Sequence, residues 1–171
     1  MMRRKLSTTL VLLGLAIISP VASATPGEVA IGQVLRNTPM QGLSGSSRLM
    51  SDYRGKPLII NVWASWCGPC RAEMGSLERL SRRGGKQFAV IGISTDDYPD
   101  DAKAFLNIAK TTFSHFIDQR LQLENMLGAD RLPLTLLIDA QGQVLEKYYG
   151  AKDWDSPESR QLIGKSFRIS M

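Results

Sequence analysis

A buried strand that runs directly into a cysteine pair and then into a helix is the feature that most limits the folds open to this chain. The segment Pro57–Ala64, PLIINVWA, is almost continuously apolar and rich in β-branched and aromatic residues, which predicts a buried central strand. From Pro69 onward the pattern changes to helical spacing, with apolar residues at Cys70, Met74, Leu77 and Leu80. The stretch WCGPC therefore lies where a strand ends and a helix begins.

Strands and helices alternate along the rest of the chain. Residues 25–50 are rich in Gly, Ser and Thr, and we expect a loose segment with short strands that form a hairpin. Gly84-Gly85 ends the first helix, and QFAVIGIS (87–94) predicts a second buried strand. The next segment opens with acidic residues and predicts an amphipathic helix whose apolar face holds Ala102, Phe105, Leu106 and Ala109.

The C-terminal third predicts a further set of short elements. FSHFID is expected to form a short strand, LQLENMLG a short helix, and LTLLIDAQGQVLEKYYG two strands joined by a turn at Gln141-Gly142. Asp155 or Ser156 then caps a final helix with Pro157 near its first turn. Strands that alternate with helices and end in a hairpin predict an α/β fold, in which helices flank a central mixed sheet.

The first 24 residues have the pattern of a secretory signal peptide. Arg3, Arg4 and Lys5 precede a nine-residue apolar stretch, Leu10–Ile18, and Ala22-Ser23-Ala24 forms a cleavage site. The apolar stretch is shorter than the roughly 20 residues of a membrane span, although an uncleaved anchor is the alternative. We therefore predict a signal peptide over 1–24, one domain over 25–171, and a periplasmic or otherwise exported location.

The charge balance argues against nucleic-acid binding. The whole chain has a formal net charge of +5. Residues 1–24 hold three basic residues and no acidic residue, so their removal leaves +2. So small a positive charge gives no electrostatic case for binding a phosphate backbone.

The two cysteines of the chain, Cys67 and Cys70, are predicted to form a redox pair. Unpaired N–H groups at a helix N-terminus carry partial positive charge, which favours a thiolate at Cys67. Cys70 follows by almost one turn and can resolve a mixed disulfide. A structural staple is the less favoured alternative, because so short a loop removes little entropy from the unfolded chain. Zinc requires more ligands than two Cys and His115 supply, and copper held by these three residues remains a further alternative.

Three more residues extend the candidate site. Glu73 lies on or beside the inward apolar stripe of the first helix, where burial should make its carboxylate reluctant to ionise. We expect it to exchange the proton of Cys70, with a capping or salt-bridging glutamate as the alternative. Pro133 directly precedes a buried strand, a position that sheets allow to proline. Trp66 offers an apolar surface beside Cys67.

These motifs together resemble the thioredoxin superfamily, and in particular its exported TlpA/ResA-like branch. The resemblance covers roughly residues 42–169 and is carried by SDYRGKPLIINVWASWCGPCRAEM, LPLTLLIDAQGQV and GAKDWDSPE. It implies a thioredoxin-like fold with an N-terminal hairpin and a strand–helix insertion in the middle of the chain. Cys70 and Pro133 are 63 positions apart, which leaves room for this insertion.

The resemblance also implies roles for individual residues. Cys67 would be the attacking cysteine, Cys70 the buried resolving cysteine, and Glu73 the acidic residue of the branch. Pro133 would follow a cis peptide bond and, with Leu132 and Trp66, bind extended client segments. The chain departs from thioredoxin itself at Asn61, where thioredoxin has a buried Asp. It also has Leu134 where Thr commonly follows the proline, so the resemblance implies no specific substrate groove or client.

The expected activity is therefore that of a disulfide reductase, without cofactor or metal. Client proteins with disulfides and a membrane-embedded thiol electron donor are the implied partners, and cytochrome c maturation is one implied task. A thiol oxidase or isomerase is the second enzymatic hypothesis. A chaperone that delivers metal or haem through the dithiol is the non-enzymatic one. A peroxidase is disfavoured, since the chain has no third cysteine.

Overall fold

A computed structural model describes residues 27–43 and 45–171, so the predicted signal peptide lies outside the described residues. The elements, in chain order, are β1 (Pro39–Gly42), β2 (Arg48–Leu49), the 3₁₀ helix η1 (Met50–Tyr53), β3 (Leu58–Trp63), α1 (Gly68–Gly84), β4 (Ala89–Ser94), α2 (Pro99–Ala109), β5 (Ser114–Ile117), α3 (Gln122–Leu127), β6 (Leu134–Ile138), β7 (Val144–Tyr149) and α4 (Pro157–Phe167).

These strands form one mixed sheet in the order β2-β1-β5-β4-β3-β6-β7. β3 pairs in parallel with β4, and β4 pairs in parallel with β5. The outer pairs, β3–β6 and β6–β7 on one side and β5–β1 and β1–β2 on the other, are all antiparallel. The N-terminal hairpin predicted for residues 25–50 is the pair β1–β2. The extra strand and helix expected in the middle of the chain lie between β4 and β6, where the chain forms α2, β5 and α3.

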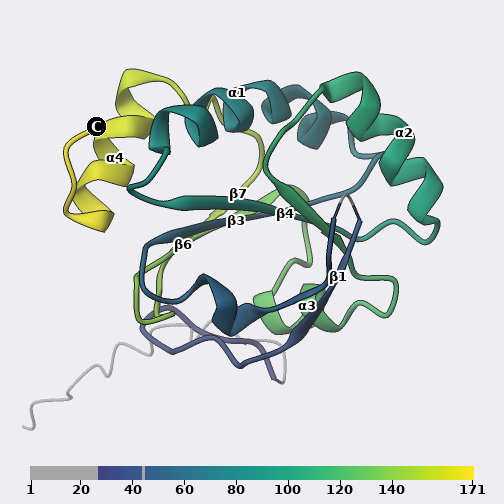
Figure 1. Ribbon diagram of the computed structural model, residues 1–171, viewed down its shortest axis with the longest axis horizontal. Helices are drawn as coiled ribbons and strands as arrows, with labels where there is room; N and C mark the ends of the chain where they lie inside the picture. The colour runs from purple at the N-terminus through teal and green to yellow at the C-terminus, as the bar shows by residue number, and fades with distance from the viewer. Residues whose placement is uncertain (1–26, 44) are drawn as a thin grey trace, which may run out of the picture.

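The sheet separates two apolar layers (Figure 1). Helices α1, α2 and α4 cover one face, and α3 and η1 lie on the other. β3 is buried along its whole length because it contributes alternate residues to both layers. Ile59 and Trp63 face α1, whereas Ile60 and Val62 face the layer that contains α3.

Helix α1 begins where the sequence indicates. Pro69 stands in its first turn, where a missing N–H costs nothing, and Gly85 at the C-cap has a positive φ of 50°. The final helix, α4, is capped by Ser156, whose hydroxyl accepts the N–H of Ser159 at 3.2 Å. Asp155, the other predicted cap, instead pairs with Arg79, Arg83 and Arg160.

None of the helices within the described ranges combines the length and the apolarity that a membrane crossing requires.

Candidate active site

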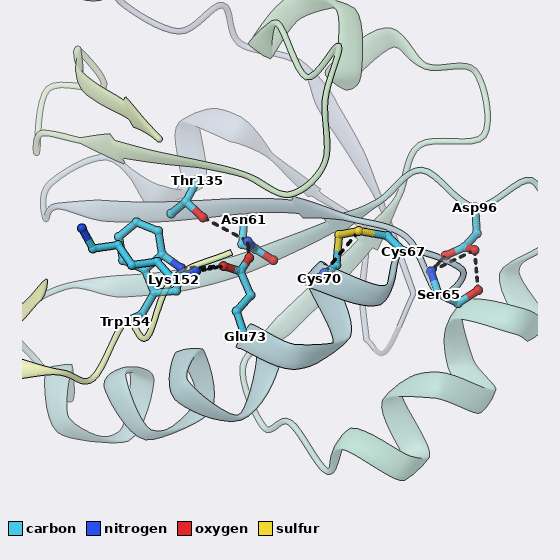
Figure 2. Close-up of a disulfide and its surroundings, with 9 residues drawn as sticks. All are labelled: Asn61, Ser65, Cys67, Cys70, Glu73, Asp96, Thr135, Lys152 and Trp154. Atoms are coloured by element: carbon cyan, nitrogen blue, oxygen red, sulfur yellow. Dashed lines mark hydrogen bonds between the residues drawn. A yellow bond between two sulfur atoms is a disulfide. The ribbon is translucent and has the colours of Figure 1, made fainter. Parts of the chain in front are cut away.

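The two cysteines form a disulfide at the amino end of α1 (Figure 2), with an S–S distance of 2.03 Å. Cys67 is the N-cap of the helix, and its backbone is still extended there. Its Sγ accepts the backbone N–H of Cys70 at 3.2 Å. When the disulfide is reduced, this N–H and the helix dipole both favour negative charge on the Cys67 sulfur.

The two sulfurs differ in their access to solvent. Cys67 is 6% exposed and lines a surface groove together with Trp66, Leu121 and Leu132. Cys70 has no exposed surface and belongs to the apolar layer beneath α1. An incoming thiol or disulfide can therefore approach Cys67 and not Cys70. An accessible Cys67 and a buried Cys70 are what the attacking and resolving roles would require, and these roles stay predictions.

The predicted client-binding residues fall partly on this groove. Trp66 is 71% exposed and stands beside Cys67, and Leu132 approaches from the segment before β6. The Leu132–Pro133 peptide bond is cis, as the resemblance implies. Pro133 itself is buried and is not among the residues that line the groove, and its carbonyl accepts the N–H of Gly150 at 2.8 Å. Trp66, Cys67 and Leu132 thus meet at one surface.

The groove is also lined by three carboxylates, those of Asp97, Glu124 and Asp130. Desolvation is the largest cause of a raised pKa at Glu124, and the nearby charge of Asp118 raises it further. Leu121, which also borders the groove, has a positive φ of 53°, an uncommon conformation for a leucine. No pattern in the sequence marks these four residues as part of the site.

Glu73 is buried, as predicted, but its carboxylate is bound to residues other than the cysteines. Oε1 accepts the amide Nδ2 of Asn61 at 2.7 Å. Oε2 accepts the indole N–H of Trp154 at 3.0 Å and the backbone N–H of Lys152 at 3.1 Å. Figure 2 shows this carboxylate beside Asn61 and Trp154, with the disulfide one helical turn away.

Burial raises the pKa of Glu73 to about 6, although the hydrogen bonds from Trp154, Asn61 and Lys152 each act to lower it. The residue is only 2% exposed, so desolvation of the charged form outweighs three donors. A carboxyl group with this pKa is present in both protonation states near neutral pH. It is thus suited to hold or release a proton inside the apolar layer beneath α1.

A second carboxylate, Asp96, holds the loop that leads into Cys67. Its two oxygens accept the backbone N–H of Ser65 at 3.1 and 2.9 Å and the Ser65 hydroxyl at 2.6 Å. The hydroxyl of Ser94, at the end of β4, also donates to it at 2.7 Å. These bonds tie the β3–α1 junction to the neighbouring strand. The acidic run after β4 is visible in the sequence, where it indicates only the start of a helix.

His115, the third ligand of the copper hypothesis, belongs to the core of the sheet. Its ring lies between Phe113, with centroids 4.4 Å apart, and Trp63, at 5.5 Å. Burial lowers the pKa of His115 to about 3, and its Nε2 lies 3.0 Å from the hydroxyl of Thr111. Within residues 27–43 and 45–171, no three His, Cys, Asp or Glu side chains are grouped closely enough to hold a metal ion.

A thioredoxin-like sheet with a disulfide at the start of its first long helix defines a class of protein, and the comparisons with known proteins agree. Residues 34–163 match the family described as Redoxin, and the chain belongs to this family. The protein is a thiol–disulfide oxidoreductase of the ResA/DsbE type, with Cys67 and Cys70 as its disulfide-forming pair.

Two curated relatives illustrate the similarity. The thiol-disulfide oxidoreductase ResA of Geobacillus thermodenitrificans is 32% identical over 117 residues, which cover 68% of this chain and 67% of the relative. The thiol:disulfide interchange protein DsbE of Vibrio cholerae is 31% identical over 133 residues, which cover 74% of this chain and 71% of the relative.

Solved structures give the same result for the fold. A crystal structure from Chlorobium tepidum, described as a thiol:disulfide interchange protein DsbE, superposes with a TM-score of 0.75 at 26% identity. The alignment covers 81% of this chain and 99% of that one. The predicted thioredoxin-like fold and the predicted ResA-like resemblance are both confirmed.

Proposed function

We propose that this protein is an exported disulfide reductase that passes electrons from its Cys67–Cys70 dithiol to disulfides of client proteins. The observation that carries the proposal is the unequal access of the two sulfurs. Cys67 caps the helix and borders the groove, whereas Cys70 is fully buried. Residues 1–24 would direct export to the periplasm. They would then be cleaved from the domain 25–171, or remain and anchor it to the membrane.

The reaction proceeds in two exchanges. The Cys67 thiolate attacks one sulfur of the client disulfide, and the other client sulfur leaves as a thiolate that takes up a proton. Cys70 then loses its proton and attacks the Cys67 sulfur, which closes the intramolecular disulfide and releases the second client thiol. Two electrons pass to the client, and its two thiolates take up two protons, one released by Cys70 and one from solvent. In this scheme Glu73 accepts or returns the proton of Cys70.

The oxidised protein must then be reduced by a second dithiol. An exported protein has no direct access to cytosolic reductants, so a membrane-embedded thiol donor would supply the electrons. Trp66 and Leu132 would hold an extended client segment against Cys67, and the buried Pro133 would support Leu132 from the next position in the chain. Apocytochrome c, whose haem-attachment cysteines must be reduced, is one client that the resemblance implies. Other exported proteins whose thiols have been oxidised to disulfides form a second class of client.

The reduction potential of the Cys67–Cys70 couple tests the direction of electron flow. Thiol trapping in redox buffers should give a value near that of thioredoxin, roughly −270 mV. A value near that of DsbA, roughly −120 mV, would make the protein a thiol oxidant and overturn the proposal.

A trapping experiment tests the roles of the two cysteines. Cys70→Ser protein should accumulate a mixed disulfide with a client peptide, because the attack at Cys67 proceeds and the resolving step is abolished. Cys67→Ser is the matched control and should accumulate none. If Cys67→Ser trapped the client as well as Cys70→Ser does, Cys67 would not be the attacking residue.

A further inference from the structure

An unsatisfied oxygen lies inside the apolar layer beneath α1. Asn61 has no exposed surface, and its Oδ1 receives no hydrogen bond from any of the described residues. Buried polar atoms in folded proteins are nearly always paired, so an exception calls for an explanation. Asn61 lies in the middle of β3, on the same face as Ile59 and Trp63, which is the face that α1 covers.

The orientation of this amide follows from its partners. Nδ2 lies 2.7 Å from Glu73 Oε1 and 3.0 Å from the hydroxyl of Thr135, on the neighbouring strand β6. An ionised carboxylate accepts hydrogen bonds and cannot donate one, so the amide must present its N–H group to Glu73. Oδ1 is then turned to the opposite side. Figure 2 shows that this side faces Cys70.

The sulfur of Cys70 carries no hydrogen while it is part of the disulfide, so it cannot donate a hydrogen bond to Oδ1. We propose that Asn61 is a positioning residue for the redox reaction, and that its Oδ1 accepts the S–H of Cys70 once the disulfide is reduced. Reduction by a dithiol breaks the Cys67–Cys70 bond, delivers two electrons and two protons, and leaves the donor as a disulfide. One of these protons resides on Cys70, where it completes the set of hydrogen bonds of Asn61.

This arrangement makes the side chain of Asn61 selective for one redox state. Its oxygen is unsatisfied beside the disulfide and satisfied beside the dithiol, so it favours the reduced protein. The ionised Glu73 carboxylate polarises the amide from its Nδ2 end, which makes Oδ1 a better acceptor. The inference needs only thiol–disulfide exchange at Cys67 and Cys70, and it holds whichever way electrons flow in the cell.

Exchange equilibria with a reference dithiol provide the test. Asn61→Leu keeps the size of the side chain but removes the acceptor, so it should shift the equilibrium toward the disulfide by about tenfold, or about 30 mV more negative. Thr135→Val is the matched control. It removes the other partner of the same amide but leaves Oδ1 in place, so the equilibrium should stay within about twofold of the original.

An unchanged equilibrium in Asn61→Leu would overturn the inference, as would an equal shift in Thr135→Val. Because Asn61 also binds Glu73, the exchange equilibria are measured at pH 8, well above the pKa of about 6 of Glu73, where its carboxylate is ionised. The shift caused by Asn61→Leu should appear there in full, and a shift confined to pH values near 6 would assign the effect to Glu73 instead. Only differences between variants are compared, so an oxidising absolute potential would contradict the proposed reductase and leave this inference standing.

Vibrational spectroscopy tests the same hydrogen bond without any change at Asn61, in case Asn61→Leu does not fold. The Cys67→Ser protein retains one thiol, Cys70, and its S–H stretching band is measured. The band should match that of an alkanethiol dissolved in an amide solvent, where S–H binds a carbonyl oxygen. A band that matches the same thiol in a hydrocarbon solvent would show a free S–H and overturn the inference.

Discussion

At the scale of single residues, Glu73 determines how the protein responds to pH. Its pKa in the folded protein is about 6, above the ordinary value of 4.5. The folded state therefore binds more protons than the unfolded state between these two values. The contribution of Glu73 to the unfolding free energy is therefore fully present below about pH 4.5. It is lost as the pH rises through about 6, by roughly 2 kcal/mol in all.

Glu73→Gln should remove this loss, because glutamine does not titrate. Denaturant unfolding at several pH values would measure it, as the difference in unfolding free energy between Glu73→Gln and the unchanged protein. The difference is the relevant quantity because buried His115, with its pKa lowered to about 3, acts in the opposite direction below pH 6.5. A difference that stays constant from pH 4.5 to 7 would contradict the raised pKa of Glu73.

Trp66 is the residue on which we expect client recognition to depend most. It is 71% exposed beside Cys67, an unusual position for so large an apolar side chain. Trp66→Ala should raise KM for a disulfide-bonded client peptide by about tenfold, because truncating an aromatic side chain at an interface costs of the order of 1 kcal/mol or more. Reduction of a small disulfide should hardly change.

Ile108→Ala is the control for this prediction. Ile108 is equally exposed, at 73%, but lies on α2 and is not among the residues that line the groove. Its replacement should leave KM unchanged. Equal effects of the two changes would mean that the groove beside Cys67 does not select the client.

At the scale of elements, the junction of β3 and α1 is positioned by the neighbouring strand. Asp96 follows β4 and accepts three donor groups, from Ser65 and Ser94. Asp96→Asn places N–H groups where the junction needs acceptors. We expect a decrease of about 1–3 kcal/mol in unfolding free energy and slower attack by Cys67 on a disulfide, measured by stopped-flow fluorescence.

Asp100→Asn makes the same change of charge at a side chain that is 95% exposed on α2. Asp100 lies in the first turn of α2 and pairs with Lys103, so its replacement should decrease the unfolding free energy by less than about 1 kcal/mol and leave the rate of attack unchanged. If Asp96→Asn decreased stability without any change in rate, the carboxylate would support the fold but not position Cys67.

The local elements were predictable from the sequence, whereas most of the contacts around Glu73 were not. Apolar spacing identified β3 and α1, and the Ser156-Pro157 pair marked the start of α4, because each signal lies within a few neighbouring residues. Lys152 and Trp154 bind Glu73 from 79 and 81 residues away, and such pairs leave no periodic pattern. The segment GAKDWDSPE is recognisable by resemblance, but nothing in its pattern gives a physical reason for its tryptophan.

At the scale of the whole molecule, the segment before α4 completes the site at the start of α1. Trp154 has no exposed surface and joins the two helices through the apolar layer that they share. Its indole N–H binds Glu73 Oε2 at 3.0 Å. The state of the Glu73 carboxylate therefore depends on how the C-terminal part of the chain is docked.

Trp154→Phe should keep most of the packing and remove this donor. The pKa of Glu73 should rise further, since the Trp154 hydrogen bond is the largest of the contributions that lower it. The variant should be destabilised by about 1–3 kcal/mol at pH 8, and by less at pH 5, where Glu73 is protonated. Unfolding free energies at the two pH values would measure the difference.

Tyr148→Phe is the control, because Tyr148 packs edge-on against Trp154 with centroids 5.8 Å apart and is not a partner of Glu73. Its effect on stability should be the same at pH 5 and pH 8. A destabilisation by Trp154→Phe that is equally independent of pH would mean that the tryptophan serves packing alone.

The distance along the chain between Glu73 and its partners also sets an order of events during synthesis. A ribosome delivers the cysteine pair about 80 residues before Lys152 and Trp154. Until these residues are added, two of the three donors to the Glu73 carboxylate do not exist. A chain that ends before residue 152, through a premature stop codon or proteolysis, carries both cysteines but not the environment that adjusts the proton affinity of Glu73. Thiol content alone therefore cannot distinguish a working molecule from a fragment.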